Sequence, residues 1–213
     1  MKRKTLDILF SIGGLGIAAL LLVAGFVLAA NASFANDYVT NQLSQQKISF
    51  KSLDTMTAEE KAQACLVTYA GQPLTTGKQA ECYANNFIGL HLEGIAGGKT
   101  YAELGDVQTQ LRTQIAALAD TDPAKADLQQ QLTTVTGQRE TVFKGESLRG
   151  MLLTSYGFSE LGAKAALAAT VAYIGAALMF LLALLGFWHG YRTPTTEAFA
   201  APAPARQRET VDA

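Results

Sequence analysis

Histidine is scarce in this chain of 213 residues, which contains only His91 and His189. A metal site on a helix needs a second histidine or a carboxylate three or four positions from the first ligand. Phe87 and Ile95 occupy the four-residue positions around His91, and Glu93 lies two residues away, on another face of the predicted helix. We therefore expect no metal site and interpret His91 as a partly buried structural residue, with metal ligation as the alternative.

Other catalytic signatures are also missing from the sequence. No serine lies in a G-x-S-x-G elbow. The glycine-rich stretch at residues 13–16 lies inside an apolar run and does not follow a strand, which excludes a phosphate-binding loop. No basic patch is visible among the 17 Lys and Arg residues, so we expect no nucleic-acid partner. We predict that the protein is not an enzyme, and that it has no catalytic residue and no cofactor.

Charge is absent from two long apolar runs, at residues 8–30 and 165–188. Each run exceeds the roughly 20 residues that a helix needs to cross about 30 Å of hydrocarbon. We predict one transmembrane helix at residues 8–30 and a second at residues 164–191. Neither span carries an ionisable residue at its centre, which argues against a proton relay or an ion path within one chain.

The charges beside the two predicted spans orient the chain. Positive residues flank the spans on the side of both termini: Lys2, Arg3, Lys4, Arg192, Arg206 and Arg208. Positive flanks favour the cytoplasm. We therefore place residues 1–7 and 192–213 on the cytoplasmic side of the plasma membrane and residues 31–163 on its outer side. The outer segment holds 10 Lys and Arg residues against 14 Asp and Glu residues. The tail is rich in proline and alanine, and we predict that it is disordered.

The first apolar run has a second interpretation. Residues 30–32 read Ala-Asn-Ala, which resembles a small-residue signal-peptidase site, and the run would then be a cleaved signal. The run has 23 residues, whereas the apolar region of a signal peptide usually has about 7–15. We therefore predict a retained anchor.

Small residues recur along one face of each predicted span. They are Gly14, Ala18, Gly25 and Ala29 in the first span, and Ala165, Ala169, Ala172 and Ala176 in the second. Such stripes let helix backbones approach closely in lipid. We predict that these faces pack on each other or on the helices of a partner; the alternative is that alanine and glycine are simply abundant here.

Cysteine occurs only twice, at Cys65 and Cys82, and both residues fall in the predicted outer segment. A pair confined to the exported part of a chain predicts a disulfide, which chain-entropy reasoning values at roughly 3 kcal/mol. Two buried thiols are the alternative. The C-x-x-C spacing of redox-active pairs is absent.

Capping boxes predict three helix starts in the outer segment. The pairs are Thr57 with Glu60, Thr76 with Gln79, and Thr100 with Glu103. Asp122 and Pro123 would end the third of these helices and begin another, which forms an αα-hairpin. The apolar stripe of this hairpin is narrow, so we expect the hairpin to pack against the rest of the domain or against another chain.

Helices are also expected to continue beyond both spans. Residues 33–46 contain neither proline nor glycine, and apolar residues between 148 and 159 recur at spacings of three and four. Residues 47–51 alternate polar and apolar side chains, but without an obvious partner strand we predict an extended loop. The predicted fold is an all-α membrane protein with two transmembrane helices and a mainly helical extracytoplasmic domain, which contains the αα-hairpin and one disulfide.

Three segments of the outer domain carry a resemblance. They read YAGQPL at residues 69–74, AGGKTYAEL at 96–104, and ESLRGMLLTS at 146–155. Together with the flanking spans they resemble a group of uncharacterised two-pass membrane proteins of actinobacteria, which implies the same two-pass architecture. The hairpin at about residues 106–140 looks like an insertion relative to shorter members, and the cysteine pair is not typical of the group.

Members of this group sometimes carry the label of an aromatic ring-opening dioxygenase subunit. Non-haem iron needs a facial set of histidine and carboxylate ligands, and the outer domain holds one histidine. We therefore do not extend that label to this chain.

The expected function follows from the anchors and from the missing catalytic groups. We expect a membrane-anchored structural or interaction protein, an accessory subunit of the cell envelope, which uses its outer helical domain as a binding surface. Its partners would be the lipid bilayer and another membrane or envelope protein, or a second copy of itself. The alternative is a sensor-like receptor that binds a ligand in the outer domain and signals through a partner, since the tail leaves no room for an output domain. An envelope enzyme would need a polar pocket with converging acid and base groups.

Overall fold

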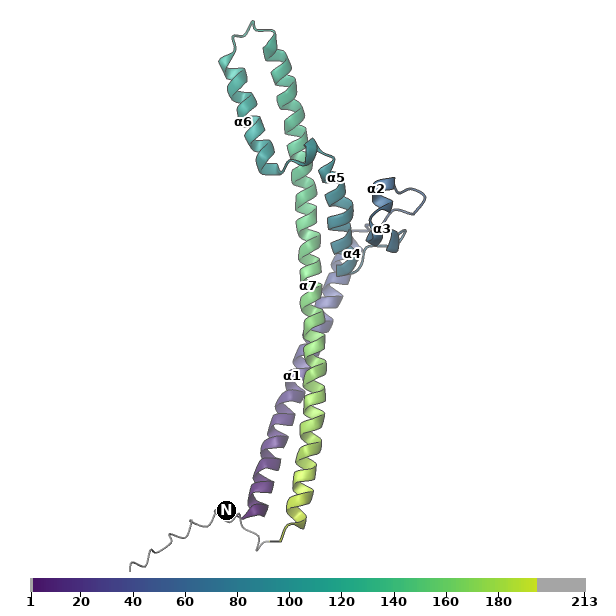
Figure 1. Ribbon diagram of the computed structural model, residues 1–213, viewed down its shortest axis with the longest axis vertical. Coiled ribbons are helices and arrows are strands. Elements are labelled where there is room, and N and C mark those ends of the chain that lie inside the picture. Colours follow the sequence, from purple (N-terminus) through teal and green to yellow (C-terminus); the bar gives the residue numbers. More distant parts are fainter. Residues whose placement is uncertain (1, 195–213) are drawn as a thin grey trace, which may run out of the picture. The chain divides into compact units, whose positions relative to one another are not determined.

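The computed structural model describes residues 2–194, and nearly all of them are helical (Figure 1). Residues 195–213, most of the predicted disordered tail at residues 192–213, lie outside the described residues. The chain divides into two compact units. The described residues of Met1–Asn31 and Ala165–Ala213 form the first, which we call the paired-helix unit, and Ala32–Lys164 form the second, the central unit.

Two long apolar helices, both predicted from the sequence, are confirmed. Helix α1 covers Arg3–Gln45 and helix α7 covers Ala124–Arg192. Each contains an apolar stretch long enough to cross a membrane. Helix α7 is longer than expected, because the second hairpin helix, the segment after it and the second apolar run form one helix of 69 residues. The glycines in this stretch do not interrupt it.

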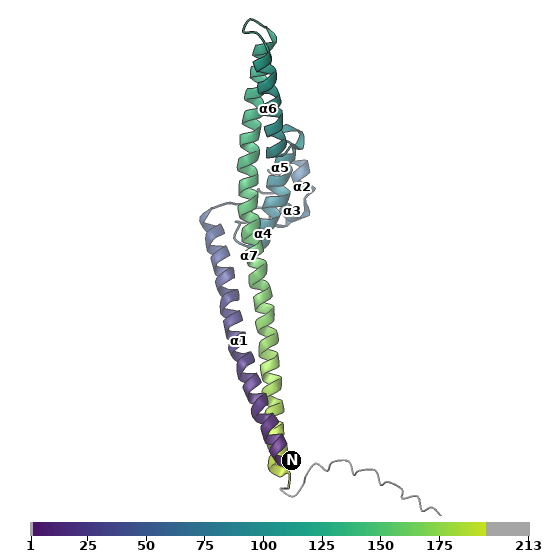
Figure 2. The same cartoon turned by 90° about the vertical axis from the view of Figure 1, so that its left-hand side faces the viewer.

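In the paired-helix unit, the buried positions recur every seven residues. On α1 they include Ser11, Ala18 and Gly25, and on α7 they include Ala169, Ala176, Ala183 and Gly190. A seven-residue repeat keeps one seam of a helix facing its neighbour, and these parts of α1 and α7 run side by side in Figures 1 and 2. The residues in the seam are small where a coiled coil in water would use leucine or isoleucine.

The central unit is built from short helices packed against parts of α1 and α7. In chain order the elements are α2 (Ala58–Lys61), α3 (Ala64–Thr68), α4 (Gly77–Cys82), the π-helix η1 (Tyr83–Ile88), α5 (Gly89–Glu93), the 3₁₀-helix η2 (Ala96–Gly98) and α6 (Tyr101–Ala117). The three predicted capping boxes are confirmed at the starts of α2, α4 and α6. Helix α6 runs beside the first part of α7 and forms the expected hairpin (Figures 1 and 2).

A hydrophobic core and a disulfide hold the short helices together. The buried core residues include Val39, Leu43, Phe50, Met56, Leu66, Leu74, Ala80, Ala84, Ile88 and Leu152. The disulfide between Cys65 and Cys82 is confirmed, and it joins α3 to the end of α4 with a Cα–Cα distance of 6.0 Å. Helices of four to six residues are not stable alone, so these two features position the remaining side chains.

Residues 47–51 form no strand, as predicted, but the prediction that they lack a pairing partner is wrong. Backbone hydrogen bonds join this segment to residues 71–74: the Phe50 amide donates to Gln72 O at 2.9 Å, and the Leu74 amide donates to Ile48 O at 2.9 Å. The pairing amounts to an isolated bridge between Ser49 and Pro73. The sequence does not indicate it, because Gly71 favours turns and Pro73 lacks an amide donor.

Candidate functional site

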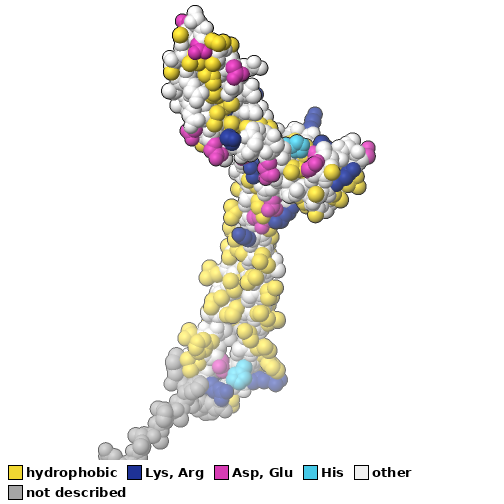
Figure 3. Space-filling view, turned by 45° about the horizontal axis from the view of Figure 1, so that its top comes forward, with side chains coloured by type: hydrophobic (Ala, Val, Ile, Leu, Met, Phe, Trp, Pro, Cys, Tyr) yellow, Lys and Arg dark blue, Asp and Glu magenta, His cyan; other side chains and the backbone are white. Residues whose placement is uncertain are grey.

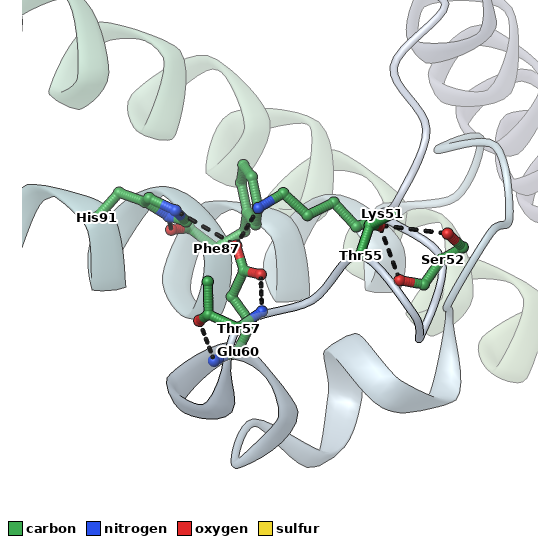
Figure 4. Close-up of polar contacts among 7 residues, drawn as sticks. All are labelled: Lys51, Ser52, Thr55, Thr57, Glu60, Phe87 and His91. Atoms are coloured by element: carbon green, nitrogen blue, oxygen red, sulfur yellow. Dashed lines mark hydrogen bonds and ion pairs between the residues drawn. The ribbon is translucent and has the colours of Figure 1, made fainter.

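A polar cluster around Glu60 lies between the loop before α2 and helices η1 and α5 (Figure 4). The Glu60 side chain is 1% exposed. Its Oε1 lies 2.7 Å from Lys51 Nζ and 3.3 Å from His91 Nε2, and its Oε2 accepts a hydrogen bond from the Thr57 amide at 2.8 Å. The capping box of α2 therefore places a carboxylate where two cationic side chains meet it.

Phe87 lies beside both cations of the Glu60 cluster. The Lys51 ammonium lies 5.4 Å from the centroid of the Phe87 ring, and the His91 ring lies 4.5 Å from it. A turn stabilises the loop that carries Lys51, since the amide and hydroxyl of Thr55 donate to Ser52 O at 3.0 and 2.9 Å (Figure 4). The faces of aromatic rings attract cations and pack against other rings, so Phe87 contributes to the positions of both side chains.

The charge state of Glu60 follows from its partners. Burial acts to raise the pKa of Glu60, but hydrogen bonds from Lys51 and the Thr57 amide, together with the charges of Lys51 and His91, outweigh it and lower the pKa. Burial also raises the pKa of Tyr83, and the nearby Glu60 charge acts in the same direction. Glu60 is therefore an ionised and fully partnered carboxylate.

His91 lies between two hydrogen-bond acceptors. Its Nδ1 lies 2.6 Å from the carbonyl oxygen of Phe87, and its Nε2 lies 3.3 Å from Glu60 Oε1. The half-exposed His91 thereby links α5 to η1 and α2, and its interpretation as a structural residue stays a prediction. Within residues 2–194, no group of three His, Cys, Asp or Glu side chains is placed to hold a metal ion.

A second polar site, which the sequence did not predict, is a cavity of about 510 Å³ in the central unit. It lies between α5, the start of α6, and α7, and we call it the charged cavity. Its polar lining includes Asn85, Glu93, Lys99, Thr100, Glu146 and Arg149. Leu92 and Val142 contribute apolar surface to the same cavity.

Arg149 is the central side chain of the charged cavity. Its Nη1 donates to both oxygens of Glu146, at 2.8 and 3.1 Å, and its Nη2 lies 3.4 Å from Asn85 Oδ1. Its Nε is buried and has no hydrogen-bond partner in the described part of the chain. Buried donors are almost always paired in proteins, so the guanidinium retains unused hydrogen-bonding capacity.

Unusual backbone borders the charged cavity on two sides. Asn85 lies on η1, and single π-helical turns occur frequently at functional sites. Ala96, Gly97 and Gly98 have positive φ values of 54°, 65° and 74°, a left-handed conformation that costs energy at the alanine. Strain of this kind persists only where the surrounding structure imposes it.

Two of the three segments singled out in the sequence meet at the charged cavity. Gly98 to Ala102 come from the AGGKTYAEL segment, and Glu146 and Arg149 come from the ESLRGMLLTS segment. These segments lie more than 40 positions apart in the chain. Only the fold of the hairpin brings them together, and no spacing rule in the sequence predicts that meeting.

The predicted packing residues lie in the paired-helix unit. Of these, Gly14, Ala18, Gly25, Ala169, Ala172 and Ala176 are buried, and Ala29 and Ala165 are half-buried. A Cβ placed on Gly14 would lie 3.4 Å from Ala183 Cβ, and one placed on Gly25 would lie 2.6 Å from the ring of Tyr173. The two faces therefore meet within the chain.

One polar contact in the paired-helix unit was not predicted from the sequence. His189 Nδ1 lies 3.1 Å from Asp7 Oδ2, close to the ends of the two apolar runs. The two residues are 182 positions apart in the chain. No local pattern relates them, although each is the charged or polar residue nearest to the end of a span.

No protein-family model, no curated protein and no solved structure matches this chain significantly. The resemblance to two-pass actinobacterial membrane proteins therefore stays a prediction.

Proposed function

We propose that the protein is anchored in the plasma membrane by the apolar runs of α1 and α7, and that it acts as a non-catalytic interaction or accessory subunit of the cell envelope. In this proposal both termini lie in the cytoplasm and the central unit lies outside. The lipid bilayer and a second membrane or envelope protein are its partners.

The exposure of large apolar side chains in the paired-helix unit carries the proposal. Phe10 is 74% exposed and Leu20 is 72% exposed. Within the most apolar stretches of α1 and α7 only 17% and 22% of the residues are buried, whereas the core helix of a soluble protein is mostly buried. Figure 3 shows hydrophobic side chains covering this unit. Small residues inside and large apolar residues outside are typical of helices that pack in lipid.

An aromatic cluster supports the position of the outer membrane boundary. Phe34, Tyr38 and Phe158 form three ring contacts, with centroids 5.7 to 6.4 Å apart. Phe34 and Tyr38 lie a few residues after the first predicted span, and Phe158 lies a few residues before the second. Phe34 and Tyr38 are at least half exposed. Aromatic rings favour the interface between lipid and water, so these residues are suited to the headgroup layer.

A surface patch on the hairpin supports an interaction role. The patch consists of Tyr101, Arg139 and Phe143, and Phe143 is 55% exposed. The Tyr101 and Phe143 rings lie 5.6 Å apart, and the Arg139 guanidinium carbon lies 4.0 Å from the Tyr101 ring centroid. Aromatic residues and arginine are enriched at the centres of protein interfaces. We infer that this patch contacts the partner.

The topology is tested with reporter fusions in cells. Alkaline phosphatase is active only outside the cytoplasm, so we expect activity when it is inserted between Asp120 and Thr121 and none when it is fused after Ala213. N-terminal sequencing of the mature protein should find the residues before Asn31 still present. Activity after Ala213, or a mature chain that lacks residues 1–30, would contradict the proposal.

The interaction role is tested by crosslinking intact cells, purifying the protein and identifying its partners by mass spectrometry. We expect one dominant partner, or a second copy, and we expect its yield to fall at least fivefold in Phe143→Ser. Thr133→Ser, an exposed change on the same helix, is the control and should keep the partner. A lone monomer in mild detergent with no crosslinked partner would exclude this role.

The charged cavity favours a second candidate function, a receptor that binds a small ligand outside the membrane and signals through the partner. Cavities of this size, with a few converging polar groups on an apolar wall, are typical of ligand sites. A receptor should change its crosslinks to the partner when its ligand binds. Crosslinks that stay unchanged at saturating ligand would exclude the receptor.

A further inference from the structure

We propose that the charged cavity binds a small zwitterion, an amino acid or short peptide, whose carboxylate faces Arg149 and Lys99 and whose ammonium group faces Glu93. The inference rests on the second candidate function and names its ligand class. It concerns residues that lie entirely within the central unit.

The unpaired charges of the cavity indicate the ligand class. Arg149 and Glu146 already bind each other. Lys99 and Glu93 form no hydrogen bond and no ion pair with any residue that the structure describes, although Lys99 attracts Glu103 at longer range. One cation and one anion are therefore left open on the same cavity. A simple anion would face Glu93 and a simple cation would face Lys99, whereas a zwitterion complements both.

The spare donors of Arg149 provide the carboxylate contact. Glu146 occupies only Nη1, the contact of Nη2 with Asn85 is long, and Nε has no partner. A guanidinium binds a carboxylate best through two parallel N–H groups. A small rotation of the Arg149 side chain would present its Nε and Nη2 edge to a ligand without breaking the ion pair with Glu146.

The backbone between α5 and α6 brings the two open charges to one cavity. Glu93 ends α5, and Lys99 precedes α6 by two residues. The left-handed run from Ala96 to Gly98 lies between them. The cavity also exposes Leu92 and Val142, which suits a ligand with an apolar side chain.

Calorimetry and thermal shift on the full chain in detergent test the inference. The probes are the twenty L-amino acids and L-alanyl-L-alanine, and the comparison ligands are acetate, methylamine and inorganic phosphate. We expect at least one zwitterion to bind and to raise the melting temperature, and we expect acetate, methylamine and phosphate to bind at least tenfold more weakly.

Three variants locate the binding in the cavity. Glu93→Gln and Arg149→Gln should each weaken binding of the zwitterion at least tenfold. Arg112→Gln removes an exposed arginine of α6 that does not line the cavity, and this variant should bind the zwitterion as the unmodified chain does. Because Glu93 makes no contact that the fold needs, its variant stays informative if Arg149→Gln unfolds.

The outcomes separate the ligand class from the receptor role. No binding by any zwitterion, or equal binding by Glu93→Gln, overturns the inference. If phosphate or a simple cation binds tightest in the cavity, the zwitterion class is wrong, and the crosslinks measured with that ligand decide the receptor role. If a zwitterion binds and the partner crosslinks do not change, the inference stands and the receptor role is wrong.

Discussion

The paired-helix unit and the central unit follow opposite packing rules within one chain. In the paired-helix unit, alanine and glycine lie between the helices while phenylalanine and leucine face outward. In the central unit, Leu66, Leu74 and Leu104 are almost fully buried, and most charged side chains lie on the surface. Water drives large apolar groups inward, and lipid does not. The difference is the one that the proposed membrane anchor of the paired-helix unit requires.

The two units also differ in how they use charge. The central unit buries an ionised carboxylate, Glu60, among cationic and amide donors. The apolar runs of the paired-helix unit contain no charge, and their polar pair of Asp7 and His189 lies near the ends of the runs. A buried charge is tolerated only with complete partners. The following predictions test this contrast, from the largest expected effect to the smallest.

Glu60→Ala should cause the largest loss. It removes a charge-assisted hydrogen bond to Lys51, which typically contributes about 1.5–3 kcal/mol. It also removes the acceptor of the Thr57 amide in the capping box, which contributes about 1 kcal/mol. The melting temperature of the full chain in detergent, followed by circular dichroism, measures the effect. Glu59→Ala, the exposed neighbour on the same helix, is the control and should change stability by less than about 1 kcal/mol. Equal effects of the two variants would show that the cluster is unimportant.

Loss of the disulfide should be the next largest effect, and it should be confined to the central unit. Cys65→Ser with Cys82→Ser frees a loop between residues 17 positions apart, and removal of such a bridge typically costs about 2–5 kcal/mol. The helix signal from the parts of α1 and α7 in the paired-helix unit should remain after the central unit melts. Simultaneous loss of all helix at the lower temperature would contradict the division into two units.

Gly25→Val should loosen the paired-helix unit. A side chain at this position meets the Tyr173 ring, which lies 2.6 Å from the added Cβ, and overpacking of this kind costs about 1–3 kcal/mol. Gly13→Val is the control on the same helix, since nothing lies within 4 Å of its added Cβ. Thermal stability in detergent distinguishes the two variants. If both behave alike, the helices do not pack through this face.

Acid should weaken the central unit more gently than Glu60→Ala, because a protonated carboxyl still forms hydrogen bonds. The pKa of Glu60 is lowered in the folded chain, so its contribution is present above the unfolded pKa of about 4.3. That contribution is lost as pH falls through the folded pKa. Melting temperatures from pH 7 down to pH 3 should fall less steeply in Glu60→Gln, and a variant with an unchanged slope would refute this assignment.

Phe143→Ser should have the smallest effect on stability. The ring is exposed, and surface substitutions usually change stability by no more than about 0.5 kcal/mol. Its melting temperature should match that of Thr133→Ser, while the partner yield described above falls. A large loss of stability would mean that Phe143 serves the fold of the hairpin and not a partner.

Local patterns predicted much of the architecture. The capping boxes at Thr57, Thr76 and Thr100 determined helix starts, because each is a contact between residues three positions apart. The disulfide was predictable because the chain contains only these two cysteines. The charged cavity and the pairing of residues 47–51 with 71–74 escaped prediction, because their partners are remote in sequence and follow no period.

The amino-acid order by itself determined that this chain forms two long apolar helices, a helical hairpin and one disulfide. Hydrophobic runs and caps depend on residues close in sequence, and the two cysteines have no other cysteine to pair with. Only the tertiary structure decided that Glu60 meets Lys51 and His91, that α7 continues without a break, and that Glu93, Lys99 and Arg149 border one cavity. Those contacts join residues that are remote in the sequence, so they depend on how the elements of the whole central unit pack together.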